Sequence, residues 1–267
     1  MGWRDVIEGL FRWIHVVAGI AWIGHLYFFN WVNAHFAATM DGETKKKVVP
    51  ELLPRALYWF RWGAAFTWVS GLMLAGLVYY MVQKPPGATA DTVVLNTNMF
   101  RDGMQGWNAA SLVMVLVTWL GFLVYDQVFG KFKDQRVSAG VGLVIVAGVL
   151  CGMDHWAHWT FRATAIHLGM LFGTTMAFNV WFRIWPAQRQ IITAVKNGTP
   201  PDAALVAMAG ARSKHNTYMS VPLVFAMLSQ HQTWAATNAP WTFLVVVAAG
   251  WWLTFHLYMI SKKVKGF

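Results

Sequence analysis

The chain has 267 residues, of which 57% are hydrophobic and only 12% are charged, and its formal net charge at pH 7 is +10. This composition excludes an ordinary soluble domain, in which about a quarter of the residues are charged. The basic residues lie in short stretches between apolar runs, a pattern typical of membrane topology signals, so the positive charge does not indicate binding to nucleic acid. The single cysteine, Cys151, excludes an internal disulfide and an all-cysteine metal cluster.

Several apolar runs reach the length of roughly 20 residues that a helix needs to cross a bilayer. We therefore predict an all-α, polytopic transmembrane helix bundle with about seven spans (seven or eight), formed by residues 1–267 as a single integral membrane domain. The fourth span is short, and its glycines favour close helix packing. The predicted spans are residues 9–33, 56–82, 106–129, 138–153, 160–184, 216–234 and 240–261.

Lysine and arginine are unevenly distributed among the connections between these spans. The first, third and fifth connections and the C-terminal tail each hold several basic residues, such as Lys45, Lys46 and Lys47 in the first, whereas the second holds only Lys84 and Arg101. Because short cytoplasmic connections are rich in these residues, we expect the N-terminus outside and the C-terminus in the cytoplasm. The long connections are then 83–105 on the outside and 185–215 on the cytoplasmic side.

The first span contains His15 and His25 among apolar, aromatic and small residues. An ionisable side chain at membrane depth is costly, which makes such histidines candidates for a functional site. At about 1.5 Å per helical residue, His15 and His167 both lie roughly 10 Å below the predicted outer boundary. His25 and His256 both lie roughly 23 Å below it.

Two histidine pairs at two depths are what a bundle holding one or two b-type haems would need, with one axial imidazole from each of two helices. His15 and His167 are the stronger candidate pair for the haem iron, and His25 and His256 the weaker. Against this, His15 and His25 are about 80° apart around their helix, so that one haem face does not serve both. The alternative is that these histidines form hydrogen bonds between helices or line small water-filled cavities.

Two further groups of polar residues are candidates for catalysis or substrate binding. The first is the run Asp154 to Trp159 at the predicted outer surface, with His155, His158 and, at the end of the sixth span, His231. A planar substrate could stack on Trp156 or Trp159 and use His155, His158 and Gln230 as donors or bases. His155 and His158 could also share a metal, whereas the plainer interpretation is an interfacial tryptophan belt.

The second group lies at the predicted cytoplasmic end of the sixth span and comprises Arg212, His215 and Asn216, with Tyr218 beside them and Asn179 on the fifth span. This group could form a pocket for a substrate or a quinone. It could equally cap helices and contact lipid headgroups.

Two segments carry a family resemblance: FRWIHVVAGIAWIGHLYFFNWVN in the first span and ARSKHNTYMSVP, residues 211–222, at the start of the sixth. With them, the chain resembles the membrane domain of bacterial membrane-bound urate hydroxylases, the urate oxidase N-terminal domain family. The resemblance implies a multi-pass protein of the bacterial inner membrane that oxidises urate to 5-hydroxyisourate and passes electrons to a cytochrome c. It assigns no catalytic residue.

Family members of the full type also carry a C-terminal cytochrome c domain, and this sequence ends at Phe267. We therefore expect a separate cytochrome c or a quinone as electron acceptor. The alternative is a non-catalytic membrane subunit, an electron conduit or scaffold in a larger respiratory or photosynthetic complex.

Overall fold

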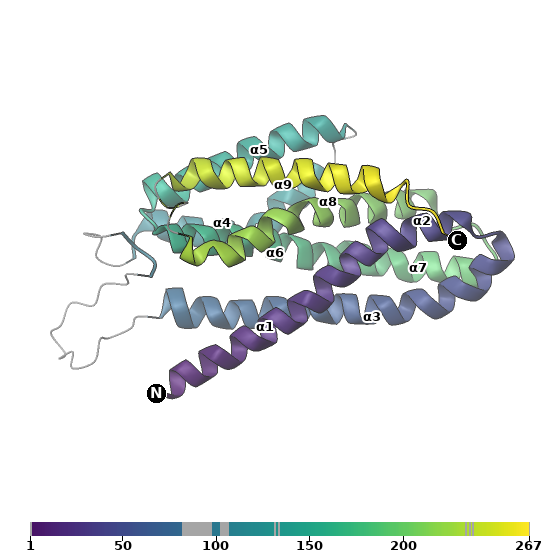
Figure 1. Cartoon of the computed structure of the whole chain (residues 1–267), viewed down its shortest axis with the longest axis horizontal. Coiled ribbons are helices and arrows are strands. Elements are labelled where there is room, and N and C mark those ends of the chain that lie inside the picture. Colours follow the sequence, from purple (N-terminus) through teal and green to yellow (C-terminus); the bar gives the residue numbers. More distant parts are fainter. Residues whose placement is uncertain are drawn as a thin grey trace. The chain divides into compact units, whose positions relative to one another are not determined.

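A computed structural model of the chain describes residues 2–81, 98–101, 107–130, 132, 134–232, 234, 236 and 238–266. Over these residues the backbone is almost entirely helical, and its single β-type pairing is an isolated bridge between Phe100 and Trp159 (Figure 1). The predicted all-α architecture is confirmed. The α-helices are α1 (Trp3–Tyr27), α2 (Ala34–Thr39), α3 (Gly42–Ala75), α4 (Ala109–Phe129), α5 (Gln135–Cys151), α6 (Phe161–Asn179), α7 (Trp185–Lys196), α8 (Ala203–Leu228) and α9 (Ala239–Ser261).

Short π-helical turns extend several of these helices, so that neighbouring elements form longer rods. They are η1 (Phe28–Asn33), η2 (Gly76–Tyr80), η3 (Gly152–Trp156) and η4 (Val180–Ile184), and a 3₁₀ turn, η5 (Ser229–His231), follows α8. In Figure 1, α1 continues through η1 into α2 without a break.

Six helices within the described part of the chain are long and apolar enough to cross a membrane, which identifies a multi-pass membrane protein. Each overlaps one predicted span, but the first, second and fifth are much longer than predicted. The first has 37 residues and extends over roughly 55 Å, well beyond the hydrocarbon thickness of a bilayer. The six are Trp3–Thr39, Gly42–Tyr80, Ala109–Phe129, Arg136–Trp156, Phe161–Lys196 and Ala239–Ser261.

The remaining predicted span, residues 216–234, corresponds to α8, which begins earlier and ends at Leu228. Its middle carries Arg212, Lys214 and His215, which make it less apolar than the six helices above. The chain between the fifth and sixth predicted spans is also more helical than expected. Residues 185–215, predicted as a connection, contain the whole of α7 and the first half of α8.

Helix starts in the connecting segments follow from capping side chains. Asn108 accepts a hydrogen bond from the Ser111 N–H at 2.8 Å at the start of α4, and Asp202 accepts one from the Ala204 N–H at 2.7 Å at the start of α8. Asp41 accepts hydrogen bonds from the backbone N–H and the hydroxyl of Thr44 before α3, and these bonds lower the pKa of the Asp41 carboxyl. Of the predicted outside connection 83–105, only residues 98–101 are described.

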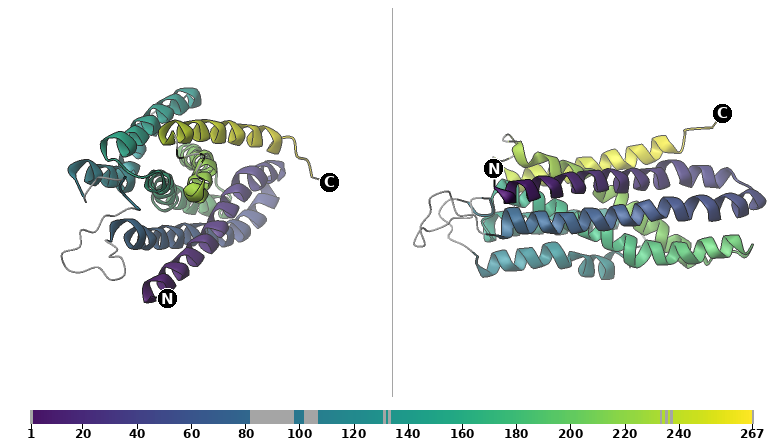
Figure 2. Two further views of the ribbon diagram at one scale, coloured as in Figure 1. Left: turned by 60° about the vertical axis from the view of Figure 1, so that its left-hand side comes forward. Right: turned by 90° about the horizontal axis from the view of Figure 1, so that it is seen from below.

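The chain forms two compact units. Unit 1 comprises Met1–Ser70, Met176–Val221 and Gly250–Phe267. Within it α1 and α3 lie side by side (Figure 2), and Gly63 permits their close approach. A Cβ atom on Gly63 would lie 3.1 Å from the backbone nitrogen of Trp22, which is tighter than normal contact.

Unit 2 comprises Gly71–Thr175 and Pro222–Ala249. Its core is a cluster of buried apolar side chains from η2, residues 99 and 100, α4, η3, the segment between η3 and α6, and the start of α6. The cluster consists of Val78, Tyr79, Met99, Phe100, Ala110, Met114, Met153, Ala157, Trp159 and Ala163. This core holds in place the loop segments that carry the polar residues described next.

Candidate functional site

In unit 2, residues 98–101 pair with residues 158–160 and form a small polar corner. The Arg101 N–H donates to the His158 carbonyl at 3.0 Å, and the Thr160 N–H donates to the Met99 carbonyl at 2.9 Å. His158 has a φ angle of 52°, in the left-handed region, which lets the chain reverse before α6. The corner brings Arg101 beside the π-helical turn η3.

Asp154 interacts with both Arg101 and His155 at this corner. The Arg101 guanidinium forms an ion pair with the Asp154 carboxylate, and its Nε donates to the Trp159 carbonyl at 3.0 Å. On its other side the Asp154 carboxylate lies 3.2 Å from His155 Nδ1. Because a carboxylate only accepts, this contact places the proton of a neutral imidazole on Nδ1 and leaves Nε2 as the acceptor.

A cleft of about 340 Å³ opens beside these residues. This volume is in the range of small-molecule sites. Its polar lining is supplied by Arg101, Asp154, His155 and Asn238, and its apolar lining by Phe161, Ala236, Ala239, Pro240 and Trp241. A base, a cation, an amide and two aromatic rings in one cleft suit a planar molecule with hydrogen-bonding edges.

Some of the residues predicted for this site line the cleft, and others do not. His155 lines it, whereas His158 is exposed and lies outside its lining. Trp159 is fully buried, and its ring nitrogen donates to Ser111 Oγ at 3.3 Å, so a substrate cannot stack on it. Trp156 is 54% exposed but outside the lining; the aromatic rings of the cleft are those of Phe161 and Trp241.

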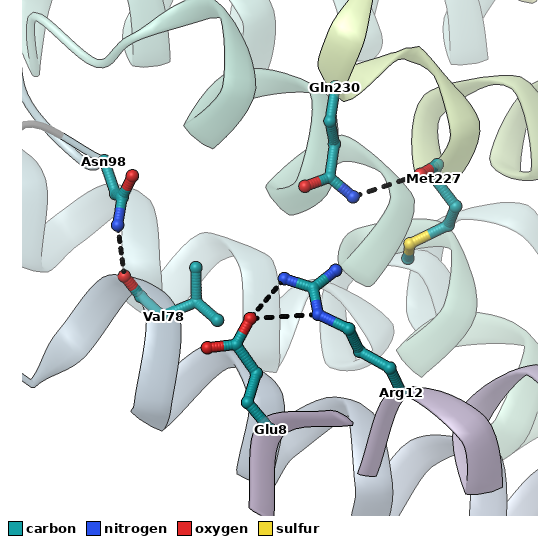
Figure 3. A network of polar contacts seen from close by, with 6 residues as sticks. All are labelled: Glu8, Arg12, Val78, Asn98, Met227 and Gln230. Atoms are coloured by element: carbon teal, nitrogen blue, oxygen red, sulfur yellow. Dashed lines mark hydrogen bonds and ion pairs between the residues drawn. The ribbon is translucent and has the colours of Figure 1, made fainter. Parts of the chain in front are cut away.

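Two other residues were predicted for this site, Gln230 and His231, and of these Gln230 does not line the cleft. The Gln230 side chain donates to the Met227 carbonyl at 3.2 Å, within its own helical end (Figure 3). The His231 side chain lies outside the described part of the structure. The sequence did not predict three residues of the cleft, because they lie far from Asp154 in the chain and form no motif with it: Arg101, Asn238 and Trp241.

His167, predicted as a haem ligand, is completely buried, and both of its ring nitrogens are engaged. Nδ1 lies 2.7 Å from the Ala163 carbonyl oxygen, and Nε2 lies 3.0 Å from the Tyr80 hydroxyl. The Trp159 ring is 4.4 Å and the Tyr79 ring 5.6 Å from the imidazole, centroid to centroid. These surroundings do not fit a haem on His167, because iron would need the position that Tyr80 occupies.

The partner predicted for His167, His15, belongs to the other unit, where its Nδ1 lies 3.2 Å from Ser70 Oγ. The second predicted pair lies wholly in unit 1. His25 Nδ1 is 2.7 Å from the Ala21 carbonyl oxygen, and His256 is exposed with its ring 4.3 Å from that of Trp252. No group of three or more His, Cys, Asp or Glu side chains within the described residues is placed to hold a metal ion.

The backbone bond of His25 resembles the way in which proteins orient metal-binding imidazoles. A carbonyl that fixes Nδ1–H leaves Nε2 directed away from the helix as the ligating atom. No hydrogen bond of His25 Nε2 is described. Of the four predicted haem ligands, His25 therefore fits the role of axial ligand best.

A buried polar network occupies unit 1 around the second predicted group. Asn216 is fully buried; its amide donates to the Met176 carbonyl at 2.9 Å and accepts from the Asn179 amide at 2.8 Å. Arg212, 7% exposed, donates to Asn179 Oδ1 at 3.5 Å. The structure thus brings Arg212, Asn216 and Asn179 together as predicted, in contacts that join α6 to α8.

The same unit contains a second polar connection, from α8 and α9 to α1 and its extension. The Tyr258 hydroxyl donates to Asn30 Oδ1 at 2.8 Å, and the Asn30 amide donates to Ser213 Oγ at 2.9 Å. Tyr218 stacks on Tyr258 with ring centroids 5.9 Å apart. His215 is half-buried on α8. These bonds tie α1, α8 and α9 together within the unit.

Comparison with known proteins gives one match. The profile of the family described as "Urate oxidase N-terminal" matches residues 3–266, nearly the whole chain. No curated protein and no solved structure is significantly similar to it.

Proposed function

Because the chain belongs to the urate oxidase N-terminal family, we propose that it is an oxidoreductase of the bacterial inner membrane that converts urate to 5-hydroxyisourate in the cleft of unit 2. The observation that carries the proposal is the Asp154–His155 pair, which faces a cleft lined by an arginine, an amide and two aromatic rings. Urate is a planar anion with hydrogen-bonding groups along its whole edge, and this set of side chains matches it in shape and charge.

The reaction adds the oxygen of one water molecule to C5 of urate and releases two protons and two electrons. His155 Nε2 takes a proton from the attacking water, while Asp154 holds Nδ1 and stabilises the imidazolium that forms. Arg101 holds the Asp154 carboxylate in an ion pair and, as part of the cleft lining, donates its remaining N–H groups to the anionic substrate. Phe161 and Trp241 contact the faces of the ring. Two ferric cytochrome c molecules, or one quinone, accept the electrons.

The proposal is tested with the purified chain in lipid nanodiscs. Urate loss is followed by its ultraviolet absorbance, and ferric cytochrome c or a soluble quinone serves as acceptor. We expect urate loss with acceptor reduction at two electrons per urate, and neither without protein. Urate binding without turnover with either acceptor would instead support the non-catalytic subunit of a larger membrane complex.

Replacement of Trp241 by alanine should weaken urate binding by about 1–3 kcal/mol, the usual effect of losing one aromatic ring stacked on a base. The corresponding change in Kd, roughly 5- to 150-fold, is measured by titration calorimetry in nanodiscs. Trp156→Ala is the matched control, because Trp156 is similarly exposed but lies outside the cleft lining. An equal loss in both variants would place the substrate elsewhere.

A b-type haem would supply one-electron transfer between substrate and acceptor, and His25 is the residue we propose to hold it. We expect the reduced-minus-oxidised optical spectrum of the purified chain to show a b-haem signal. The signal should be lost in His25→Ala. It should be retained in His167→Ala, because Nε2 of the wild-type His167 side chain is already bonded to Tyr80. A colourless preparation of wild-type protein would exclude the haem, and the opposite pattern would restore His167 as the ligand.

A further inference from the structure

A partly buried tyrosine–histidine pair in unit 2 has no part in the proposed cleft chemistry. The Tyr80 hydroxyl lies 3.0 Å from His167 Nε2 and accepts a hydrogen bond from Trp119 Nε1 at 3.0 Å. His167 is fully buried at the middle of this arrangement. Tyr80 and Trp119 are half-buried. Three polar aromatic side chains of η2, α4 and α6 that bind one another inside a membrane protein are a candidate for function rather than for packing alone.

The direction of each hydrogen bond follows from the partners. The Ala163 carbonyl oxygen, 2.7 Å from His167 Nδ1, can only accept, so Nδ1 carries the proton of the neutral imidazole. Nε2 is then an acceptor, and the Tyr80 hydroxyl must donate to it. The indole N–H of Trp119 can only donate, so the Tyr80 oxygen accepts from it. The phenol therefore points its proton at an unprotonated nitrogen.

This arrangement is suited to one-electron chemistry. A phenol that loses an electron becomes strongly acidic, and oxidation without an acceptor for the proton inside an apolar protein would leave a buried cation unpaired. At Tyr80 the proton can move to His167 Nε2 along the existing bond. The imidazolium that results keeps both N–H groups bonded, one to the Tyr80 oxygen and one to the Ala163 carbonyl.

We propose that Tyr80 is a redox-active tyrosine that gives one electron to a strong one-electron oxidant while its hydroxyl proton passes to His167. The O–H bond of Tyr80 breaks, an N–H bond forms at Nε2, and the products are a neutral tyrosyl radical, an imidazolium and the reduced oxidant. Return of one electron to Tyr80 brings the proton back. The pair goes beyond urate oxidation and needs no bound substrate, so its test is independent of the cleft.

Neighbouring aromatic rings offer a route for the electron to the surface of the unit. The Trp107 ring lies 5.8 Å from that of Tyr80 and is 37% exposed. On the other side, the Trp159 ring is 4.4 Å from His167, and its carbonyl binds Arg101 at the cleft. An electron can thus pass from Tyr80 through Trp107 to an oxidant outside the protein, and the oxidant does not need to contact the Tyr80–His167 pair.

The test oxidises the full chain in nanodiscs with a flash-excited ruthenium polypyridyl complex and persulfate, and records the trapped radical by electron paramagnetic resonance. We expect a tyrosyl signal in the wild type, identified by its change with ring-deuterated tyrosine, and its loss in Tyr80→Phe. His167→Gln should lower the radical yield. Tyr79→Phe is the matched control and should keep the signal, because the Tyr79 ring meets the imidazole only edge-on.

A second measurement uses only the wild-type protein and therefore does not depend on how the variants fold. After exchange into deuterium oxide, electron–nuclear double resonance should detect, besides the deuteron on Trp119 Nε1, a second exchangeable deuteron hydrogen-bonded to the radical oxygen, the one transferred to His167. A wild-type radical without such a coupling, or an unchanged signal in a folded Tyr80→Phe variant, would overturn the proposal. Thermal unfolding of each variant shows whether it is folded.

Discussion

We expect His155→Gln to lower kcat for urate oxidation by roughly 10²- to 10⁴-fold, the usual contribution of a general base. The variant keeps a hydrogen-bonding side chain beside Asp154, but an amide cannot take the proton from the attacking water. The rest of the cleft lining, with Arg101, Phe161 and Trp241, is unchanged, so the KM for urate should change little. The measurement is urate-dependent acceptor reduction in nanodiscs over a range of urate concentrations.

His158→Gln is the matched control for this prediction. His158 is an exposed imidazole in the same turn, but it does not line the cleft. Its removal should leave kcat within about twofold of wild type, as is usual for a side chain that takes no part in catalysis. Equal losses in both variants would mean that the turn acts as a structural unit, and no loss in either would remove His155 from the mechanism.

Asn216→Leu should destabilise unit 1 by about 1–3 kcal/mol, because it leaves the Met176 carbonyl and the Asn179 amide without their partner in a buried position. The two side chains have the same number of non-hydrogen atoms, so the substitution leaves no cavity behind. Hydrogen bonds between membrane helices are often weaker than this, so we expect the change to lie at the lower end of the range. Denaturant unfolding in detergent, followed by tryptophan fluorescence, measures the change.

The control for the Asn216 variant is Asn33→Leu. Asn33 is half-buried in η1 of the same unit, and within the described residues its side chain makes no recorded hydrogen bond. Its replacement should change the free energy of unfolding by less than about 0.5 kcal/mol, as for most substitutions away from such networks. A destabilisation of similar size in both variants would mean that the amide network of Asn216 adds nothing specific.

Helix positions were largely predictable because the cost of transferring a segment into a bilayer depends on its own composition. Six predicted spans coincide with helices that can cross a membrane. The polar segments were less predictable. Residues 185–215, predicted as the cytoplasmic connection, contain α7 and the first half of α8, since a helix such as α7 needs only one apolar stripe and a favourable start, here Pro186 in its first turn.

The functional groups were predictable only in part. The polar group of Arg212 and Asn216 was recognised from sequence because it lies at the end of the sixth predicted span, in the segment that carries the family resemblance, and the structure places both residues with Asn179. The histidine pairs were proposed from depth alone, which says nothing of rotation about a helix or of nearer partners. Tyr80, which binds His167, shows no sequence signal that distinguishes it from Tyr79 beside it.

The sequence by itself determined the all-α membrane architecture and the family, since both depend on local composition and on short segments such as residues 211–222. The tertiary structure decided which side chains meet: Arg101 with Asp154, Trp241 in place of Trp159 at the cleft, and Tyr80 with His167. The physical reason is that hydropathy is a property of each segment alone. A hydrogen bond or ion pair instead depends on two residues, often far apart in the chain, meeting within about 3 Å.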